Sequence, residues 1–286
     1  MEGHMDFMDN RILILVLVAA LMSFPGIASS QEELPVEMEW NGETYFQTYG
    51  IIPEEDLLQM DVVREINDHE VFVPADKEGE IYVYNGIGYV IFVSESILEE
   101  SMTDYGEPEV EISGDLGPFE EETYAARLIT SPTSYSSADS AAKRVKGYWG
   151  SADYLYYSAC TKNAVKSRLS GTVTHWYNVG HGNTNLVAFY DDSMYASEFN
   201  GLPGINGNRI LLNSCLTYNG ELKTAITSEN PNFFIAGKIN LPVGPSEEVS
   251  GDFWYYYSVK GMNEIDALNA AVSDNSGSSG WFGLWT

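Results

Sequence analysis

Two apolar runs in the second half of the chain, each followed by a chemically reactive side chain, constrain the fold most strongly. Thr172–Val179 (TVTHWYNV) leads into Gly180-His181-Gly182, and Arg209–Asn213 (RILLN) leads into Ser214-Cys215. Runs of this length and composition are typical of buried strands. If these strands are parallel neighbours, His181 and Cys215 emerge at the carboxyl edge of one sheet, where open α/β folds place their reactive groups. A thiol and an imidazole in one crevice are the minimum set of groups that covalent acyl transfer requires.

Strand and helix signals alternate around these runs, which predicts an α/β domain with a mostly parallel sheet and helices on both faces. We expect the flavodoxin-like strand order 2-1-3-4-5. The expected strands are 127–130, 154–159, 172–179, 209–213 and 233–237, with 281–285 as a final strand at the sheet edge. The expected helices are 137–148, capped by a serine, 162–169, capped by Thr161, 251–259 and 263–272.

The start of the chain predicts export. Arg11 supplies a positive charge, Ile12–Met22 is an apolar core too short to span a bilayer comfortably, and 26–30 (GIASS) offers small residues for cleavage. We therefore expect residues 1–30 to be a signal peptide and the protein to be secreted or displayed at the cell surface. An uncleaved membrane anchor is the competing interpretation. No second apolar run of spanning length follows, so we expect no stable membrane span after cleavage.

Charge divides the remaining chain into an acidic N-terminal region, 31–123, and a second domain, 124–286. Residues 31–123 hold 26 Asp and Glu against two basic residues, Arg64 and Lys77, whereas 124–286 holds 13 acids against 11 bases. The net charge of −28 argues against nucleic acid as a partner, because the phosphate backbone would be repelled. A solvated acidic surface and cation binding are the interpretations that remain.

The acidic region contains its own structural signals. Residues 81–93 (IYVYNGIGYVIFV) form two β-rich arms around Asn85-Gly86, which predicts a hairpin with a two-residue type I′ turn. Residues 53–66 begin with Pro and acids and carry apolar residues near helical spacing, which predicts a short helix. Residues 95–122 have the composition of a linker or a loosely ordered arm. The predicted boundary falls near 119–123.

Three segments in order carry a resemblance to a known superfamily. YNVGHG at 177–182, ILLNSC at 210–215 and FFIAG at 233–237 are similar to the caspase and gingipain superfamily of clan CD cysteine peptidases, which includes the CHAT domains. The resemblance covers roughly 127–272 and is nearest to the gingipain branch, since the interval from His to Cys is short. It implies a caspase-like fold and a peptide or protein substrate.

The resemblance also implies a division of roles in the site. Cys215 would be the nucleophile, His181 the acid that protonates the leaving amine, and the backbone N–H groups of Gly182 and Cys215 the oxyanion donors. A glycine at 182 suits this role because the absence of a Cβ lets substrate backbone approach closely. Family members often work as a dyad, so no third residue is assigned and no cofactor is required.

The two cysteines leave a structural alternative open. In an exported chain with only Cys160 and Cys215, a disulfide between them is the default expectation. In the expected strand order, however, they end strands three spacings apart, about 14 Å, whereas a bridge needs Cα atoms within about 7 Å. We therefore expect Cys160 to be a free structural thiol.

Other polar residues of the chain have structural interpretations as well. His175 lies too far along its strand to serve Cys215 and is expected to be a core histidine, while His69 is expected to be solvated. Asp191-Asp192 and Glu247-Glu248 are interpreted as loop charges. The alternative is that one of these acids, or Asp252, lines a primary specificity pocket. Calcium binding by these carboxylates stays open, although no EF-hand pattern is present.

Two classes of function follow from the sequence. The preferred one is an exported cysteine endopeptidase whose acidic region is a prosegment or a substrate-recruiting module. The alternative is a catalytically inert caspase-like protein that binds other molecules at the cell surface. A weaker third interpretation is transpeptidation, since an amine can capture the same acyl-enzyme.

Overall fold

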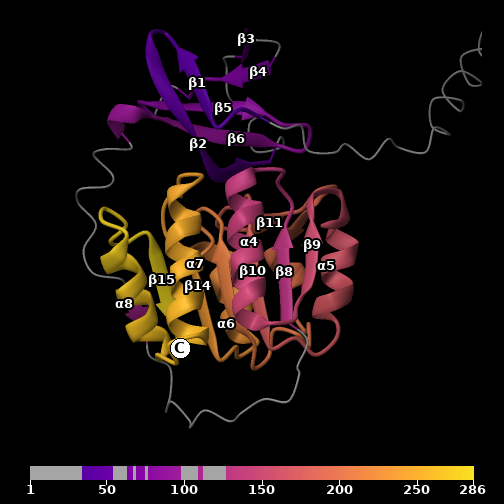
Figure 1. Cartoon of the computed structure of the whole chain (residues 1–286). Helices are drawn as coiled ribbons and strands as arrows, with labels where there is room; N and C mark the ends of the chain where they lie inside the picture. The colour runs from indigo at the N-terminus through magenta and orange to yellow at the C-terminus, as the bar shows by residue number, and fades with distance from the viewer. Residues whose placement is uncertain (1–33, 54–62, 67–68, 75–76, 98–108, 112–126) are drawn as a thin grey trace, which may run out of the picture.

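The computed structural model describes residues 34–53, 63–66, 69–74, 77–97, 109–111 and 127–286. The predicted signal peptide and the predicted domain boundary lie outside these ranges. The described chain forms two sheets, an antiparallel one near the N-terminus and a larger mixed one with helices packed against it (Figure 1).

The larger sheet has seven described strands in the order β7-β15-β14-β13-β10-β8-β9. These are β7 Glu109–Glu111, β8 Arg127–Ser131, β9 Asp153–Tyr156, β10 His175–Val179, β13 Arg209–Asn213, β14 Phe233–Gly237 and β15 Phe282–Trp285. Five of these strands lie side by side in the order β9, β8, β10, β13, β14 and are parallel. This is the predicted 2-1-3-4-5 order. The C-terminal strand β15 joins antiparallel to β14, and β7 pairs beyond it. The α/β prediction is confirmed, with a sheet that is mixed rather than wholly parallel.

Helices cover both faces of this sheet, as predicted. The described helices are α4 Ser136–Trp149, α5 Lys162–Leu169, α6 Gly220–Ser228, α7 Pro245–Ser258 and α8 Glu264–Asp274. Buried side chains of α4, α7 and α8 join one apolar cluster, and those of α5 and α6 join another on the opposite face. A small antiparallel pair, β11 Leu186–Ala188 and β12 Ser193–Tyr195, lies between β10 and β13 in the chain.

Several predicted boundaries are wrong for identifiable reasons. Strand β10 begins at His175 rather than Thr172, because both neighbouring strands begin opposite His175. The strand predicted to run to Ala159 ends at Tyr156, where a 3₁₀ turn begins at Tyr157 with a φ of 47°. Helix α6 was not predicted.

Of the predicted helix ends, one is correct and two are wrong. Thr161 caps α5 as predicted, since its Oγ1 accepts a hydrogen bond from the Ala164 N–H. The predicted serine cap of α4 is wrong, because Tyr135 precedes the helix and makes no side-chain cap bond. Helix α7 starts at Pro245, six residues before its predicted start. Proline in the first turn is a start signal, because its fixed φ suits a helix and its missing N–H is not needed there.

The antiparallel sheet has the order β1-β2-β6-β5-β4-β3. Its strands are β1 Glu37–Trp40, β2 Glu43–Ile52, β3 Val63–Ile66, β4 His69–Phe72, β5 Glu80–Tyr84 and β6 Tyr89–Ser94. The predicted hairpin is present, but four residues connect its strands. The Asn85 side chain accepts bonds from the N–H groups of Ile87 and Gly88, and the Asn85 N–H donates to the Gly88 carbonyl. The type I′ turn is therefore wrong, and so is the helix predicted over 53–66 where 63–66 forms a strand.

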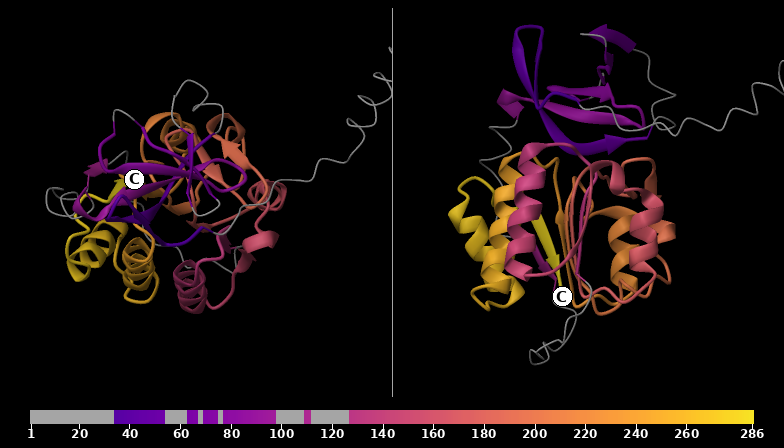
Figure 2. Two further views of the ribbon diagram at one scale, coloured as in Figure 1. Left: turned by 90° about the horizontal axis from the view of Figure 1, so that it is seen from above. Right: turned by 45° about the vertical axis from the view of Figure 1, so that its right-hand side comes forward.

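The antiparallel sheet lies across the end of the seven-stranded sheet at which β8 and β9 finish (Figures 1 and 2). Strand β2 is the point of contact, since its residues 47–51 make backbone hydrogen bonds to segments that follow β10 and β14. None of the helices in the described ranges has the length and apolar character needed to cross a bilayer.

His175 should govern part of the pH dependence of stability. Its ring packs against both Trp149 and Trp254, and burial, helped by Arg209 and Arg127, lowers its pKa to about 3. The unfolded chain, with a histidine pKa near 6.5, therefore binds more protons as the pH falls, and the folded state loses stability below about pH 6.5. In urea unfolding at pH 7, 6 and 5, His175→Gln should reduce this loss by up to about 1.4 kcal/mol per pH unit.

An added measurement at pH 8 is the internal control for His175→Gln, since an unfolded-state imidazole with a pKa near 6.5 loses only about 0.2 of a proton between pH 7 and pH 8. Equal slopes for wild type and variant between pH 6 and pH 5 would contradict a buried, neutral His175.

Candidate active site

The pairing of β10 with β13 brings His181 and Cys215 to one edge of the sheet. Val179 lies opposite Asn213 in the parallel register, and the Gly180 N–H continues the ladder to the Asn213 carbonyl at 3.1 Å. His181 and Cys215 each follow these paired positions by two residues, on strands about 4.8 Å apart. The predicted juxtaposition at the carboxyl ends of two parallel neighbours is therefore present.

A strained turn holds the cysteine. Leu216, directly after Cys215, has a φ of 56°, a left-handed conformation that β-carbon-bearing residues seldom adopt. The Thr217 hydroxyl donates to the Ser214 carbonyl at 2.8 Å and closes the turn. A Cβ on Gly182 would lie 2.7 Å from Thr217 Cγ2 and 3.0 Å from Ser214 Cβ. Glycine at 182 thus lets the histidine loop and the cysteine turn approach each other.

Asn178 connects the strand ends beneath the site and was not singled out from the sequence. Its Nδ2 donates to Ser214 Oγ at 2.9 Å, and its Oδ1 accepts from Thr130 Oγ1 at 2.8 Å. All three side chains are buried. An asparagine in the middle of an otherwise apolar strand is the signal that could have revealed it, because buried polar groups require partners.

Strand β2 bends toward the segments that follow β10 and β14, beside the histidine and the cysteine. Gln47 pairs with Phe92 and Ile51 with Val90, so three residues of β2 face only Ile91 of β6. This irregularity has the character of a β-bulge, which re-aims a strand locally. Residues 48–50 leave the antiparallel sheet there, and both Thr48 and Tyr49 are fully buried.

The backbone of the bent segment is bonded on both sides of the site. On one side the Tyr49 N–H donates to the Leu241 carbonyl at 3.0 Å, and Thr48 forms an antiparallel bridge with Pro242. On the other side the Gly182 N–H donates to the Tyr49 carbonyl at 2.8 Å, and Gly50 forms a parallel bridge with Gly182. The Gly182 N–H, which was expected to be an oxyanion donor, therefore already donates to the peptide carbonyl of Tyr49.

Both reactive side chains are enclosed. Burial raises the pKa of the Cys215 thiol well above its usual range, and hydrogen bonds from Thr48 and from the Leu241 and Tyr49 backbone oppose this only in part. The Leu241 N–H donates to Cys215 Sγ at 2.9 Å. Burial lowers the pKa of His181 to about 4, and the Tyr49 backbone partly opposes the shift. In this closed arrangement both groups are neutral at pH 7.

The His181 ring contacts two tyrosines. Its centroid lies 5.7 Å from that of Tyr49, and its Nε2 lies 3.4 Å from Tyr135 Oη. Its Nδ1 is buried and makes no hydrogen bond of standard geometry.

The two cysteines are separate, buried and free. Cys160 belongs to the apolar cluster under α5 and α6, whereas Cys215 belongs to the cluster under α4, α7 and α8. A disulfide between them is absent from the structure, and the expectation of a free structural Cys160 is confirmed.

The acids considered from the sequence occupy different environments. Asp191 accepts the Lys162 N–H at the start of α5, and Asp192 pairs with the Lys162 ammonium. Glu248 pairs with Arg144 at 2.8 Å. Glu247 differs, since it is buried and its Oε1 accepts a hydrogen bond from Tyr49 Oη at 2.5 Å. The interpretation of Glu247-Glu248 as loop charges is wrong, because both residues lie in the first turn of α7.

Metal ligation gains no support from the geometry. The described residues contain no group of three or more His, Cys, Asp or Glu side chains arranged to hold an ion. The side chain of His69 lies outside the described part of the chain.

The solved structures that match this chain include two of low similarity. No family model matches the sequence, and no curated protein matches it. The Arg-specific cysteine proteinase gingipain R (RgpB) superposes with a TM-score of 0.42 and 12% sequence identity over 56% of this chain and 45% of that chain. The complex of Porphyromonas gingivalis RgpB pro- and mature domains gives a TM-score of 0.44 and 13% identity over 56% and 46% of the two chains. This chain thus spans less than half of either structure, and its function is inferred from its own geometry.

Because Cys215 is enclosed, we expect its thiol to be unreactive in the folded chain. The thiolate is the nucleophilic form, so a buried neutral thiol should react with iodoacetamide at pH 8 at least ~100-fold more slowly than an exposed one. Intact-mass spectrometry should show no modification of the folded protein and two modifications after unfolding in guanidinium. Rapid single modification at Cys215 in the folded protein would contradict the closed arrangement.

Proposed function

We propose that the protein is an exported cysteine endopeptidase held in a latent form, with Cys215 as nucleophile and His181 as acid–base group. The observation that carries the proposal is the Tyr49 carbonyl, which accepts the N–H of Gly182, the residue directly after His181. A peptide group in this position imitates a bound substrate. Export is inferred from residues 1–30 of the sequence alone.

The proposed reaction uses both side chains once the crevice opens. The thiol proton passes to His181, and the thiolate attacks the substrate carbonyl carbon while the oxyanion accepts the Gly182 N–H. Collapse of this intermediate breaks the C–N bond, and the imidazolium gives its proton to the leaving amine. Water then hydrolyses the thioester, with His181 taking its proton and returning it to the thiol. Backbone donors of this kind contribute on the order of 3 kcal/mol each.

The acidic region takes the role of a prosegment in this proposal. Its strand β2 excludes water and substrate from the site, and its burial of Cys215 and His181 keeps both in their neutral forms. A substrate-recruiting module would leave the crevice open to a peptide. The position of Thr48 and Tyr49 in the crevice therefore favours a prosegment.

A variant that loosens β2 should reveal the activity. Tyr49→Ala removes a fully buried aromatic side chain, and such truncations cost about 3–5 kcal/mol of packing. Residues 48–50 should therefore leave the site more often in the variant than in wild type. We expect a peptidyl acyloxymethyl ketone to label Tyr49→Ala at least ~100-fold faster than wild type, and a mixed fluorogenic peptide library to be cleaved by the variant.

The two cysteines provide a matched pair of controls. In the Tyr49→Ala background, Cys215→Ala should abolish both labelling and cleavage, whereas Cys160→Ala should retain them, because Cys160 lies on the opposite face of the sheet. Absence of labelling in Tyr49→Ala with intact folding would overturn the peptidase proposal and favour the inert surface protein. Cleavage that survives Cys215→Ala would overturn it as well.

A further inference from the structure

The side chain of Tyr49 is fully enclosed beside the site. The ring is fully buried, and its centroid lies 6.2 Å from that of Tyr135 and 5.7 Å from that of His181. The hydroxyl reaches Glu247 in the first turn of α7. Aromatic walls and one acceptor at the far end thus define a pocket that matches the length and polarity of a tyrosine side chain.

Hydrogen-bond donors around Glu247 hold its carboxylate in place. Its Oε2 accepts the Gly244 N–H at 2.6 Å and the Ser246 hydroxyl at 3.3 Å. Its Oε1 accepts the Ser137 hydroxyl at 2.8 Å in addition to Tyr49. The carboxylate is therefore fixed in place and has one site directed at the pocket occupant.

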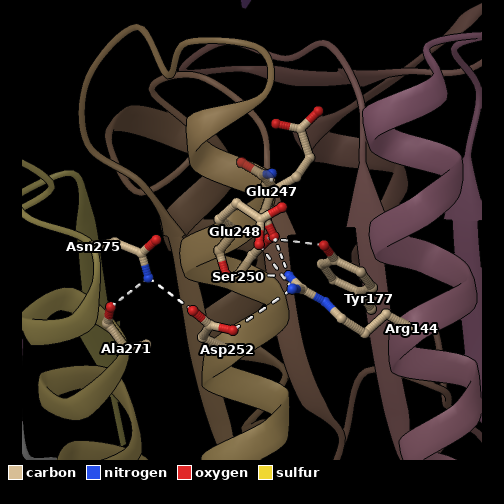
Figure 3. A network of polar contacts seen from close by, with 9 residues as sticks. Arg144, Tyr177, Glu247, Glu248, Ser250, Asp252, Ala271 and Asn275 are labelled. Atoms are coloured by element: carbon tan, nitrogen blue, oxygen red, sulfur yellow. Dashed lines mark hydrogen bonds and ion pairs between the residues drawn. The ribbon is translucent and has the colours of Figure 1, made fainter.

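Burial raises the pKa of Glu247, whereas hydrogen bonds from Tyr49, Ser137 and the backbone favour its charged form. Helix N-termini stabilise carboxylates through their free N–H groups, and Glu247 lies at the third position of α7. Arg144 of α4 also bonds the Glu247 carbonyl at 3.2 Å and the Glu248 carboxylate at 2.8 Å. Figure 3 shows the Glu247 carboxylate projecting away from this arginine network. A neutral hydrogen-bond donor is the partner that this environment favours.

The backbone register identifies which substrate residue this pocket would receive. The Tyr49 carbonyl accepts the Gly182 N–H, and the Tyr49 N–H donates to Leu241. The bond in the position of attack is therefore Tyr49–Gly50, and Tyr49 occupies the place of the residue on its N-terminal side. The side chain of that residue is the one that enters the pocket.

We propose that this pocket is the primary specificity pocket and that it selects tyrosine on the N-terminal side of the cleaved bond, through the hydrogen bond to Glu247. The proposal rests on the proposed peptidase function for its catalytic meaning. Tyr49 then occupies the pocket in place of a substrate residue until residues 48–50 leave the site.

The choice of tyrosine over phenylalanine follows from the buried acceptor. A site that hydrogen-bonds a hydroxyl rejects the analogue that lacks it, because its own polar group is left unpaired. Loss of one hydrogen bond to a charged group corresponds to roughly ten- to hundredfold in affinity. Phenylalanine would fill the same aromatic walls and leave Glu247 Oε1 with the Ser137 hydroxyl but without the donor that tyrosine supplies.

A small-molecule experiment tests the pocket without requiring catalysis. Tyr49→Ala should leave a cavity with the shape of the missing side chain, and buried cavities bind small aromatic molecules. We expect p-cresol, the tyrosine side chain alone, to bind Tyr49→Ala at least ~10-fold more tightly than toluene, measured by concentration-dependent rises in Tm. Wild type, whose pocket is filled, should show no such rise. Equal or tighter binding of toluene overturns the proposal.

Neighbouring glutamates provide matched controls. In the Tyr49→Ala background, Glu247→Gln should reduce the preference for p-cresol, because one amide oxygen must then serve Gly244, Ser137 and the ligand. Glu248→Gln removes the same charge one residue away and should leave the preference unchanged. The preference is a ratio within one protein, so a loss of overall stability does not alter it. An unchanged ratio in Glu247→Gln overturns the role of Glu247.

Substrate probes then test specificity. Acyloxymethyl ketones that differ only in the residue next to the warhead should label Cys215 of Tyr49→Ala at least ~10-fold faster with tyrosine than with phenylalanine or arginine. Faster labelling with phenylalanine or arginine overturns the tyrosine preference and leaves the peptidase proposal intact. Absence of labelling by every probe overturns the peptidase proposal, whereas the p-cresol result still reports on the pocket.

Discussion

The in-register pairing of β10 with β13 is the constraint on which the rest of the site depends. Because Val179 lies opposite Asn213, the two residues beyond each strand emerge at the same level of the sheet. A slip of one residue would turn alternate side chains to the opposite face and separate His181 from Cys215. The bonds of Asn178 to Ser214 and Thr130 tie three strand ends together and oppose such a slip.

The second constraint is the irregularity in β2. A regular strand would keep Thr48, Tyr49 and Gly50 in the antiparallel sheet, whereas the extra residues opposite Ile91 let the chain bend toward Gly182 and Leu241. The bend has a chemical consequence, since it removes water from the thiol and the imidazole. Charged forms of both groups are disfavoured in that environment, so one backbone feature controls both the access to the site and its protonation state.

The sequence predicted the architecture of the larger sheet well because buried parallel strands are marked by short apolar runs and helices by caps and spacing. The strands 209–213 and 233–237, helix 162–169 and the 2-1-3-4-5 order agree with the structure. Errors occurred where tertiary contacts set a boundary. Gly251 was predicted to open helix α7, yet it lies inside that helix, where a Cβ would require the Arg144 guanidinium to shift.

The contents of the candidate site were only half predictable. His181, Gly182 and Cys215 lie on the predicted edge, since local pattern and register determine their positions. Tyr49 could not be identified, because its role depends on a bend in β2 and on contacts with residues nearly 200 positions later in the chain. Glu247 was noticed only as one acid of a pair. Its burial follows from its position at the start of α7 beneath Tyr49, which no local pattern reveals.

If the protein is the proposed latent peptidase, the segment around Tyr49 must resist cleavage, and the geometry supplies a reason. If Cys215 attacked the Tyr49 carbonyl, the released amine would belong to Gly50, whose neighbour Ile51 donates to the Gly182 carbonyl and pairs with Val90 of β6. The amine would therefore stay beside the thioester. Groups held in this way react with effective concentrations of about 10⁵ M or more, so re-formation of the peptide bond outpaces attack by water that the strand excludes. Under the proposed function, the anchoring of β2 on both sides of the site accounts for lasting inhibition.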